Sequence, residues 1–398
     1  MLLKLSTKYL LTRMLSMDPA ASPIVCHVTT VHPVPDPRIF LKQCRSLAAA
    51  GFDVHVIITG DGEGFDWQNV HPISVGERTT NRLRRVLLFP KIACELRRLR
   101  PQVIHFHDPE LLPLMCLLQA TALTCSKFIY DVHEDYATLV KTYGFPWNLT
   151  VWLYDRLARF AERHMTFVLA EESYQERFQR IHPVIHNFST AVPGPVESER
   201  DNTFIYVGSV CETRGALTMT ECFRRLQQPS WRLQVIGPAS EELAAHLRSV
   251  AASASVFPSQ IEVCDYLPLS VALGKIRRAK VGLCLLSPEP NYVGSLPTKV
   301  FDYLSVGVPV ILSDFPYYRR FFDGVPGIHF VDATNLAEVE SKMREFCNPA
   351  LAQRYIEEAI VGRDICQRRF TWRAEADRLT KIYRELINHS LMADNIVK

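Results

Sequence analysis

The stretch 291-NYVGSLPTKVFDYLSVGVPVI-311 joins a glycine turn, a helix and a β-branched apolar run. Pro297 fits the first position of the helix, and Pro309–Ser313 is typical of a short buried strand. Short β-branched runs alternate with helical stretches in the same way from residue 24 onward. This alternation is typical of parallel sheets flanked by helices, so the sequence predicts the α/β fold class.

The chain divides into two similar halves, with six expected strands in each. The first half holds Ile24–Thr29, Asp53–Ile58, Gln102–His105, Lys127–Asp131, Thr166–Leu169 and Val184–His186. The second holds Thr203–Val207, Arg232–Ile236, Ile261–Cys264, Val281–Leu285, Pro309–Ser313 and Ile328–Val331. Between them, residues 189–202 contain two prolines and no periodic apolar pattern, which indicates a linker. Two such domains create a cleft, where we expect the site.

Composition excludes several classes of protein. The 398 residues are 47% hydrophobic and 22% charged, which excludes a disordered or fibrous chain. A net charge of +3 gives no overall attraction to nucleic acid. Eleven cysteines without any Cys-x-x-Cys pair suggest reduced core thiols and a cytoplasmic protein.

Most familiar signatures of catalytic or cofactor sites are absent. The sequence has no P-loop, no His-Glu-x-x-His and no Gly-x-Ser-x-Gly, and the glycines at 60, 62 and 64 do not complete a dinucleotide fingerprint. It also lacks Asp-x-Asp, which could hold a divalent cation against a diphosphate. We therefore expect neither a metal nor a bound cofactor.

Three polar constellations follow strands of the first half. They are Asp36-Pro37-Arg38, then His105-Phe-His107-Asp108-Pro109-Glu110, and Asp131-Val-His133-Glu134-Asp135. Crowded ionisable groups shift one another's pKa values and are costly unless used, which favours a site with His133 as the hydrogen-bonding residue. Structural explanations stay open, because His105 fits a satisfied core histidine and both Asp36 and Asp108 fit helix caps.

Two constellations of the second half suit a nucleoside diphosphate. Gly208 and Ser209 follow a strand, and Arg214 stands at a helix entry, where helix N–H groups and an arginine together bind phosphate. Lys299 lies in the first helical turn behind Pro297, with Asp302 three residues on. A carboxylate at Asp302 can accept the two vicinal hydroxyls of a ribose.

These motifs together resemble family 4 glycosyltransferases of the GT-B fold, over residues 24–385, and in particular a bacterial subgroup for polysaccharide or glycolipid synthesis. The resemblance implies retaining transfer of a sugar from a nucleotide diphosphate, without a required metal. It also implies that the C-terminal helix returns to the first domain. The expected organisation is an extension at 1–22, domains at 23–188 and 203–365 with the linker between them, and a crossover helix at 366–390.

The resemblance also assigns roles to residues of this chain. Arg214 and Lys299 stand where the family neutralises the leaving diphosphate, and the amides around Ser295 and Leu296 where it holds phosphate and sugar. Asp302 matches a ribose-binding glutamate, and His133 a histidine near the reacting centre. The full predicted set is His133, Arg214 and Lys299 as catalytic residues; Gly208, Ser209, Arg214, Ser295, Leu296, Lys299 and Asp302 at the donor; and Asp36, Arg38, His107, Asp108, Glu110, Glu134 and Asp135 toward the acceptor.

The chain departs from the family pattern at three positions. Gly294 stands where the first of two paired glutamates is usual, Asp302 is one methylene shorter than the second, and Ser209 replaces an arginine. These departures leave two alternatives beside the transferase. One is a partner subunit that binds the sugar nucleotide without catalysis, and the other is a nucleotide-sugar epimerase.

A basic stretch in the first half suggests where the acceptor comes from. Residues 78–100 carry seven arginines and one lysine with interleaved aliphatic residues, a pattern that suits a surface for anionic lipid. Residues 1–17 add three cations and no acid, but the cations interrupt any membrane span. A solvated helix over an ordinary core explains 78–100 equally simply, and a frayed extension or a transit peptide would explain 1–17.

The expected partners are a nucleotide sugar, a saccharide or lipid-linked acceptor and an anionic membrane, and not nucleic acid. The identities of the sugar, base, acceptor, linkage and oligomer are left open.

Overall fold

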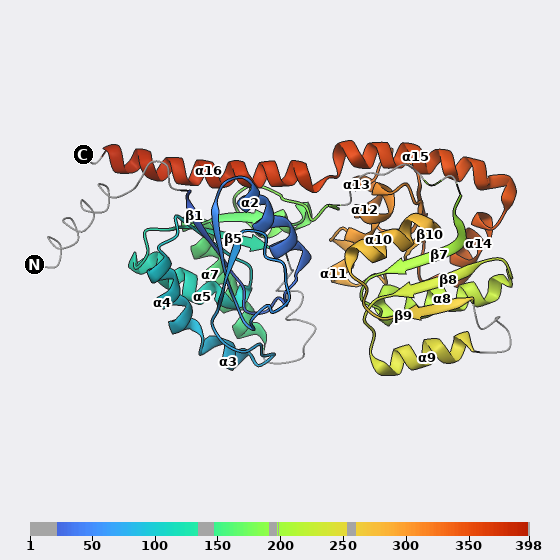
Figure 1. Ribbon diagram of the computed structural model, residues 1–398, viewed down its shortest axis with the longest axis horizontal. Coiled ribbons are helices and arrows are strands. Elements are labelled where there is room, and N and C mark those ends of the chain that lie inside the picture. The colour runs from blue at the N-terminus through green and yellow to red at the C-terminus, as the bar shows by residue number, and fades with distance from the viewer. Residues whose placement is uncertain (1–21, 134–146, 191–196, 198, 253–259, 397–398) are drawn as a thin grey trace, which may run out of the picture.

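The computed structural model describes residues 22–133, 147–190, 197, 199–252 and 260–396. Figure 1 shows two α/β domains placed end to end along the long axis, with the last two helices running across both. Each domain is built on one fully parallel six-stranded sheet. The predicted fold class is therefore confirmed.

The first sheet has the strand order β3-β2-β1-β4-β5-β6. Its strands are β1 (Ile24–Val28), β2 (Asp53–Ile58), β3 (Val70–Ser74), β4 (Val103–Phe106), β5 (Lys127–Val132) and β6 (Thr166–Leu169). The order reverses between β1 and β4, and ligands of open parallel sheets bind beyond the carboxyl ends of strands at such a point.

One strand of this sheet was mispredicted. The strand β3 was not predicted, because it contains Pro72; it lies at the sheet edge, where a missing N–H donor is tolerated. The sequence instead predicts a strand at Val184–His186, where Val184 forms only an isolated bridge with Leu169. The predicted number of strands was right, but one of the six predicted strands, Val184–His186, is not a strand of the sheet.

Helices cover both faces of the first sheet. The segments are η1 (Pro37–Cys44), α2 (Arg45–Ala49), α3 (Arg82–Val86), α4 (Phe89–Leu99), η2 (Pro109–Leu111), α5 (Leu112–Thr121), α7 (Trp147–His164) and η3 (Glu172–Arg177). One apolar layer packs α4, α5 and α7 against one face. The other layer packs the π-helical η1 and α2 against the opposite face.

The second sheet repeats the same topology with the order β12-β11-β10-β7-β8-β9. Its strands are β7 (Asp201–Val207), β8 (Arg232–Ile236), β9 (Ile261–Cys264), β10 (Ala279–Cys284), β11 (Val310–Ser313) and β12 (Ile328–Val331). All six were predicted, with ends that differ by at most two residues. The order reverses between β7 and β10, which marks the second expected binding position.

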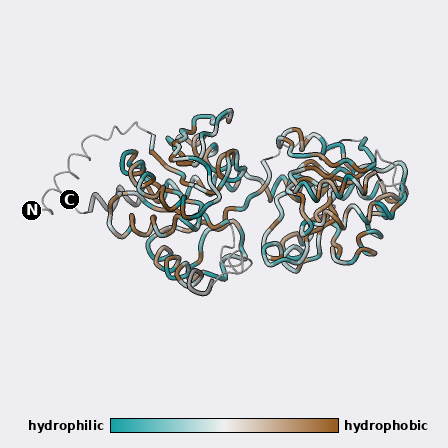
Figure 2. The backbone as a smooth tube through the Cα atoms, turned by 90° about the horizontal axis from the view of Figure 1, so that it is seen from below, coloured by the Kyte–Doolittle hydropathy of each residue, from teal (hydrophilic) through white to brown (hydrophobic). Residues whose placement is uncertain are grey.

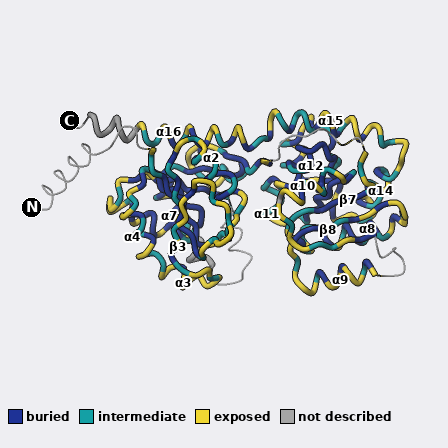
Figure 3. Tube along the Cα trace, in the orientation of Figure 1, coloured by how far each residue is buried: buried dark blue, intermediate teal, exposed yellow. Residues whose placement is uncertain are grey.

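The second domain is also covered on both faces. Its helical segments are η4 (Glu212–Arg214), α8 (Ala216–Leu226), α9 (Glu241–Ala251), α10 (Leu269–Arg278), α11 (Pro290–Val293), α12 (Thr298–Ser305), α13 (Pro316–Phe321), α14 (Leu336–Phe346) and η5 (Pro349–Leu351), followed by α15 (Ala352–Arg369) and α16 (Trp372–Ile396). The strands form the apolar, buried centre of each domain in Figures 2 and 3, and polar exposed residues lie outside.

The last two helices connect the domains. Phe370 belongs to the core of the second domain, whereas Trp372, two residues later, belongs to the core of the first. The indole Nε1 of Trp372 donates to Ser46 Oγ at 2.8 Å, which fixes the start of α16 on α2. The helix α16 then runs along the first domain, so the predicted return of the C-terminal helix is confirmed (Figure 1).

None of the helices in the described part of the chain combines the length and apolarity that a membrane span requires.

Candidate active site

The donor side is built where β7 ends, at the reversal of strand order in the second sheet. Gly208 follows β7 with a φ of +137°, a conformation that favours glycine. A Cβ at Gly208 would lie 3.2 Å from the Lys299 Nζ atom. The ammonium of Lys299 is therefore packed directly against the turn that closes β7.

Lys299 is a buried cation. It is the second residue of α12, and its Nζ lies 3.9 Å from the centre of the Tyr206 ring. Burial, reinforced by repulsion from Arg214, lowers the pKa of Lys299 to about 8. Within the described residues, no carboxylate lies within ion-pair distance of its Nζ.

Arg214 is the second cation at this position. It ends the short η4 turn, and its Nε donates to the Tyr292 hydroxyl at 3.4 Å, with the guanidinium 5.7 Å from that ring's centre. The described chain offers Arg214 no ion pair either. Two partly or fully buried cations without an acid are costly, and an anionic ligand would offset that cost.

The other predicted donor residues have protein partners. The Ser295 amide donates to Tyr292 O at 3.3 Å, and the Leu296 amide donates to Glu171 Oε1 at 3.0 Å. Both amides thus have protein acceptors, and their place at phosphate and sugar stays a prediction. Asp302 Oδ1 accepts from Ser189 Oγ at 2.5 Å. Ser209 is exposed at the end of β7, and its carbonyl accepts from Tyr206.

Asp302 has an unusual environment for a carboxyl group. Burial raises its pKa, although Ser189, Lys42 and Lys299 act in the opposite direction. The predicted proximity of Lys299 and Asp302 is reflected in this electrostatic coupling. Because Ser189 belongs to the predicted linker and Lys42 to the first domain, Asp302 lies where the two domains meet.

His133 stands at the carboxyl end of β5 in the first domain. Its Nε2 lies 3.0 Å from His32 Nε2, and its Nδ1 lies 3.2 Å from the Asp131 carbonyl oxygen. The imidazole is half-buried. Glu134 and Asp135, which the sequence analysis places toward the acceptor, lie outside the described residues.

Asp131 is the centre of a buried hydrogen-bond network behind His133. Its carboxylate accepts from Arg38 Nε and Nη2 at 2.9 and 2.7 Å, from Gln43 at 2.9 Å, and contacts His107 Nδ1 at 3.1 Å. Burial acts to raise the pKa of Asp131, but Arg38 and the histidines hold it well below its usual range. Arg38, which the sequence places toward the acceptor, is buried against Asp131 instead.

The remaining acceptor-side residues are also held by protein groups. Asp108 is fully buried and accepts from the hydroxyls of Thr29 and Thr30. His107 is buried between His27 and Asp131. Glu110 forms a bidentate ion pair with Arg85 at 2.7 and 2.8 Å. His107 and Asp108 are buried and Glu110 is held by Arg85, and a role of the three toward an acceptor stays a prediction.

Asp36 is the N-terminal cap of η1, which agrees with the structural explanation that the sequence offered for it. Its Oδ1 accepts from the Ile39 amide at 2.9 Å, and its Oδ2 lies 3.5 Å from His32 Nδ1. Burial acts to raise the pKa of Asp36, yet His32 and the Ile39 amide hold it at about 2.

Two further residues of the site, His32 and Glu171, were not predicted from the sequence. His32 contacts His133 and Asp36, and it lies 3.7 Å from Asp108, so it joins three predicted motifs. Glu171 follows β6 and reaches the second domain through Leu296 and the Tyr317 hydroxyl. Both follow strands of the first sheet, the signal that identified the other motifs.

The arrangement suits transfer chemistry at an anionic leaving group. One domain presents two cations at the end of β7, and the other presents a half-buried imidazole at the end of β5. Direct contacts of Glu171 with Leu296 and of Ser189 with Asp302 join the two sides. A charged diphosphate would be stabilised by the cations as its bond to a sugar breaks.

Comparisons with known families agree with this geometry. Residues 38–200 match the model of Glycosyltransferase Family 4, and residues 218–381 match a Glycosyl transferase-like model. A search of curated proteins found no match.

Solved structures share the fold. A sucrose-phosphate synthase from Thermosynechococcus elongatus is 16% identical, with 92% of this chain and all of that chain covered and a TM-score of 0.68. HepE from Anabaena in complex with UDP is 10% identical, with 91% and 100% covered and a TM-score of 0.69. A glycosyltransferase from Rickettsia africae is 14% identical, with 92% and 99% covered and a TM-score of 0.69. The two family matches span both domains, and the chain belongs to the GT-B glycosyltransferases, with a family 4 first domain.

Proposed function

We propose that this chain transfers a sugar, with retention of configuration, from a nucleoside diphosphate to a saccharide or lipid-linked acceptor. The observation that carries the proposal is the pair of cations Arg214 and Lys299, which has no acidic partner among the described residues. HepE, a structural neighbour, was solved in complex with UDP-glucose, which supports a sugar nucleotide as the donor. Retention comes from the family resemblance.

The reaction breaks the bond between the anomeric carbon and the diphosphate oxygen, and its electron pair stays on the diphosphate. Arg214 and Lys299 stabilise the charge that develops there, without a metal at this position. The oxygen of an acceptor hydroxyl forms the new bond to the anomeric carbon, and its proton passes to the departing diphosphate. His133, held by Asp131 and His32, positions the sugar from the first domain.

The test is release of a nucleoside diphosphate from a panel of UDP-, GDP-, ADP- and dTDP-sugars, in EDTA, with and without a bacterial lipid extract. We expect release from one donor, stimulated by the acceptor and lost in Lys299→Ala. The matched control is Lys275→Ala, because Lys275 is a half-exposed lysine of α10 in the same domain. A donor that binds without turnover would favour the partner subunit, and a new sugar nucleotide without acceptor would identify an epimerase.

We also propose that the acceptor is presented by an anionic membrane at the surface of α3 and α4. Leu83 and Leu87 are 78% and 76% exposed, and Val86 is exposed beside them. The neighbouring cations Arg82, Arg84 and Lys91 are exposed as well. An apolar tip ringed by cations suits the interface of an anionic bilayer.

The structure sharpens the variant that tests this surface. Arg85 is buried against Glu110 and is no part of the exposed patch, so its substitution would perturb folding instead. We expect Leu83→Ser combined with Leu87→Ser to abolish cosedimentation with anionic liposomes. The control pair is Val271→Ser and Ile356→Ser, two exposed aliphatic residues of the other domain. Unchanged cosedimentation of the α3 variant would remove α3 as the membrane contact.

A further inference from the structure

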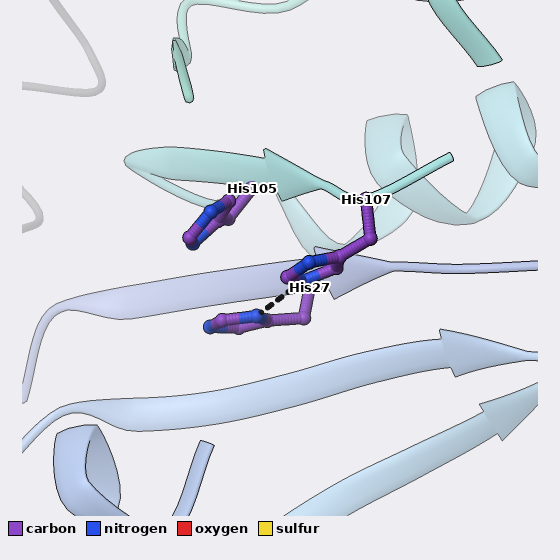
Figure 4. Close-up of side chains that lie close together, drawn as sticks. All are labelled: His27, His105 and His107. Carbon is purple, nitrogen blue, oxygen red and sulfur yellow. Dashed lines mark hydrogen bonds between the residues drawn. The ribbon is translucent and has the colours of Figure 1, made fainter. Parts of the chain in front are cut away.

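Three buried histidines meet on one face of the first sheet. His27 lies on β1, His105 on β4 and His107 just after β4, and none is more than 1% exposed. One ring nitrogen from each lies within 4.8 Å of the others. Figure 4 shows the three imidazoles gathered beside the two strands.

Strand register forces this proximity. His27 and His105 are direct partners in the parallel pairing of β1 with β4. His107 is two residues beyond His105, so its side chain points to the same face. The ring centres are 4.7 to 5.2 Å apart. The ligand set is therefore fixed by two adjacent central strands.

The imidazoles are poor bases here. Burial, reinforced by repulsion from neighbouring histidines, lowers the pKa of His27 and of His105 well below the usual range. The pKa of His107 is lowered to about 3, again chiefly by burial. Burial thus acts against the charged form of each ring.

The outer nitrogens of the rings already have partners. His107 Nδ1 lies 3.1 Å from Asp131 Oδ2, while His105 Nδ1 and His27 Nε2 lie 2.7 and 3.1 Å from the Tyr383 hydroxyl. Metal-binding histidines usually donate their outer N–H to such carboxylates or oxygens, which leaves the inner lone pair for the ion. Tyr383 belongs to α16, so this outer shell includes the crossover helix.

The inner nitrogens are left in a costly arrangement. With protons on the outer atoms, His27 Nδ1 and His107 Nε2 face each other at 2.9 Å as two lone pairs. His105 Nε2 is buried with no hydrogen-bond partner. A cation among the three rings would satisfy all of these lone pairs.

We propose that His27, His105 and His107 form a structural zinc site that fastens the first sheet and, through Tyr383, the crossover helix. Imidazole nitrogens suit Zn²⁺, and three of them leave one of its four tetrahedral positions to a fourth ligand such as a water. The burial of all three histidines favours a structural role for the ion. The site is separate from the diphosphate position, where the sequence predicts no metal.

A metal-free arrangement is the alternative outcome. In it, His105 donates to Tyr383, Tyr383 to His27, His27 to His107, and His107 to Asp131. That chain pairs every other nitrogen but leaves His105 Nε2 a buried bare acceptor, at a cost of about 1–3 kcal/mol.

The test is the metal content and the X-ray absorption of the full chain, purified without a histidine tag from zinc-supplemented cells. We expect one zinc per chain that survives EDTA, with nitrogen ligands at about 2.0–2.1 Å. Absence of zinc from the folded wild-type chain, both as purified and after refolding with Zn²⁺, would overturn the proposal.

Variants then locate the ion. His105→Gln should lose it, whereas His71→Ala should keep it, because His71 belongs to a surface group with His55 and Asp53. Tyr383→Phe should weaken zinc binding by about 10–100-fold. A second candidate group consists of His107, Asp131 and His133. If His133→Gln loses the zinc and His105→Gln keeps it, the ion is bound by this second group and the proposal is overturned. If His105→Gln does not fold, the absorption spectrum of the wild type still decides, because it counts the imidazole rings on the ion: three in the first group and two in the second.

Discussion

The two domains have the same sheet topology, but they treat charge differently at the carboxyl ends of their strands. In the first domain, Asp131 is neutralised by Arg38, and Glu110 by Arg85. In the second, Arg214 and Lys299 lie close together with no acid in ion-pair contact among the described residues. Asp131 and Glu110 are thus neutralised within the first domain, whereas Arg214 and Lys299 are neutralised only when an anion binds.

This difference in charge pairing distinguishes residues that stabilise the fold from residues that bind a ligand. Polar groups whose partners are all internal act by holding the fold, as Asp131 holds η1 and His107 against the sheet. Cations without partners are destabilising until a ligand arrives, which is the trade between stability and activity expected at a binding site. Substitutions in the two regions should therefore have opposite effects on stability.

The largest effect on stability is expected when the hydrogen-bond network of Asp131 in the first domain is disrupted. Asp131→Ala leaves the Arg38 guanidinium buried without its partner, so we expect a loss of about 3–5 kcal/mol in the free energy of unfolding. Urea denaturation measures it. Asp201→Asn is the control, because the Asp201–Arg278 pair is exposed and should change stability by less than about 0.5 kcal/mol. A loss for Asp131→Ala as small as the control's would show that the network carries no stability.

Breaking the second domain should reduce activity without reducing stability. We expect Lys299→Met to lower kcat by about 10²–10³-fold, since it removes a group that stabilises the leaving diphosphate. Its free energy of unfolding should rise by about 1 kcal/mol at pH 7, because a buried unpaired cation is removed. Steady-state kinetics and urea denaturation of the same sample measure both, and a loss of stability would contradict the comparison.

The pH dependence follows from the same lysine. The folded pKa of Lys299, about 8, is below its ordinary value of 10.5, so the unfolded chain binds more protons between these values. The contribution of Lys299 to stability should therefore rise with pH in that window, while donor binding falls as the cation is lost. Lys299→Arg should move the alkaline limb of the kcat/KM profile to higher pH, and a profile identical to wild type would exclude Lys299 as the titrating group.

The sequence predicted more of the second domain than of the first. The six strands of the second sheet are short runs rich in apolar or alternating residues, and each lies near a glycine or proline. In the first sheet, Pro72 disguises an edge strand, and Val184–His186 is β-branched but pairs at one residue only. Local pattern cannot distinguish these cases, because pairing at an edge depends on neighbours that are distant in sequence.

The sequence identified most residues of the site, but not the residues with which they form hydrogen bonds. Motif spacing placed His133 after a strand, Arg214 at a helix entry and Lys299 in the first turn of a helix, where the structure has them. It did not show that Arg38, His107 and Asp108 are turned inward, because each has a partner about 80 or more residues away, on another strand or loop. Glu171 was missed for the same reason, since its significance lies in Leu296, 125 residues later.

Glu171 offers a smaller test, at the contact between the two regions. Burial raises the pKa of Glu171 to about 8, so the folded chain holds more protons than the unfolded chain between pH 4.5 and 8. Stability should fall as pH rises through that window. Glu171→Gln keeps an acceptor for the Leu296 amide and should flatten this dependence, with a gain on the order of 2 kcal/mol at pH 8. Thermal denaturation from pH 5 to 8 measures it, and parallel curves for the two proteins would refute the assignment.

The smallest expected effect concerns Asp36, which belongs to the internally neutralised region although it lies beside His32 and His133. Asp36→Ala removes the cap of η1 and should cost about 1 kcal/mol of stability, whereas Asp36→Asn, which keeps the accepting oxygen, should cost much less. Because the pKa of Asp36 is about 2, the difference between wild type and Asp36→Asn should vanish as pH falls from about 4 to 2. If Asp36→Asn instead lowered kcat strongly while leaving stability unchanged, Asp36 would act on the acceptor. Asp36, in the loop after β1, would then belong to the residues that act on a ligand and not to those that only stabilise the fold.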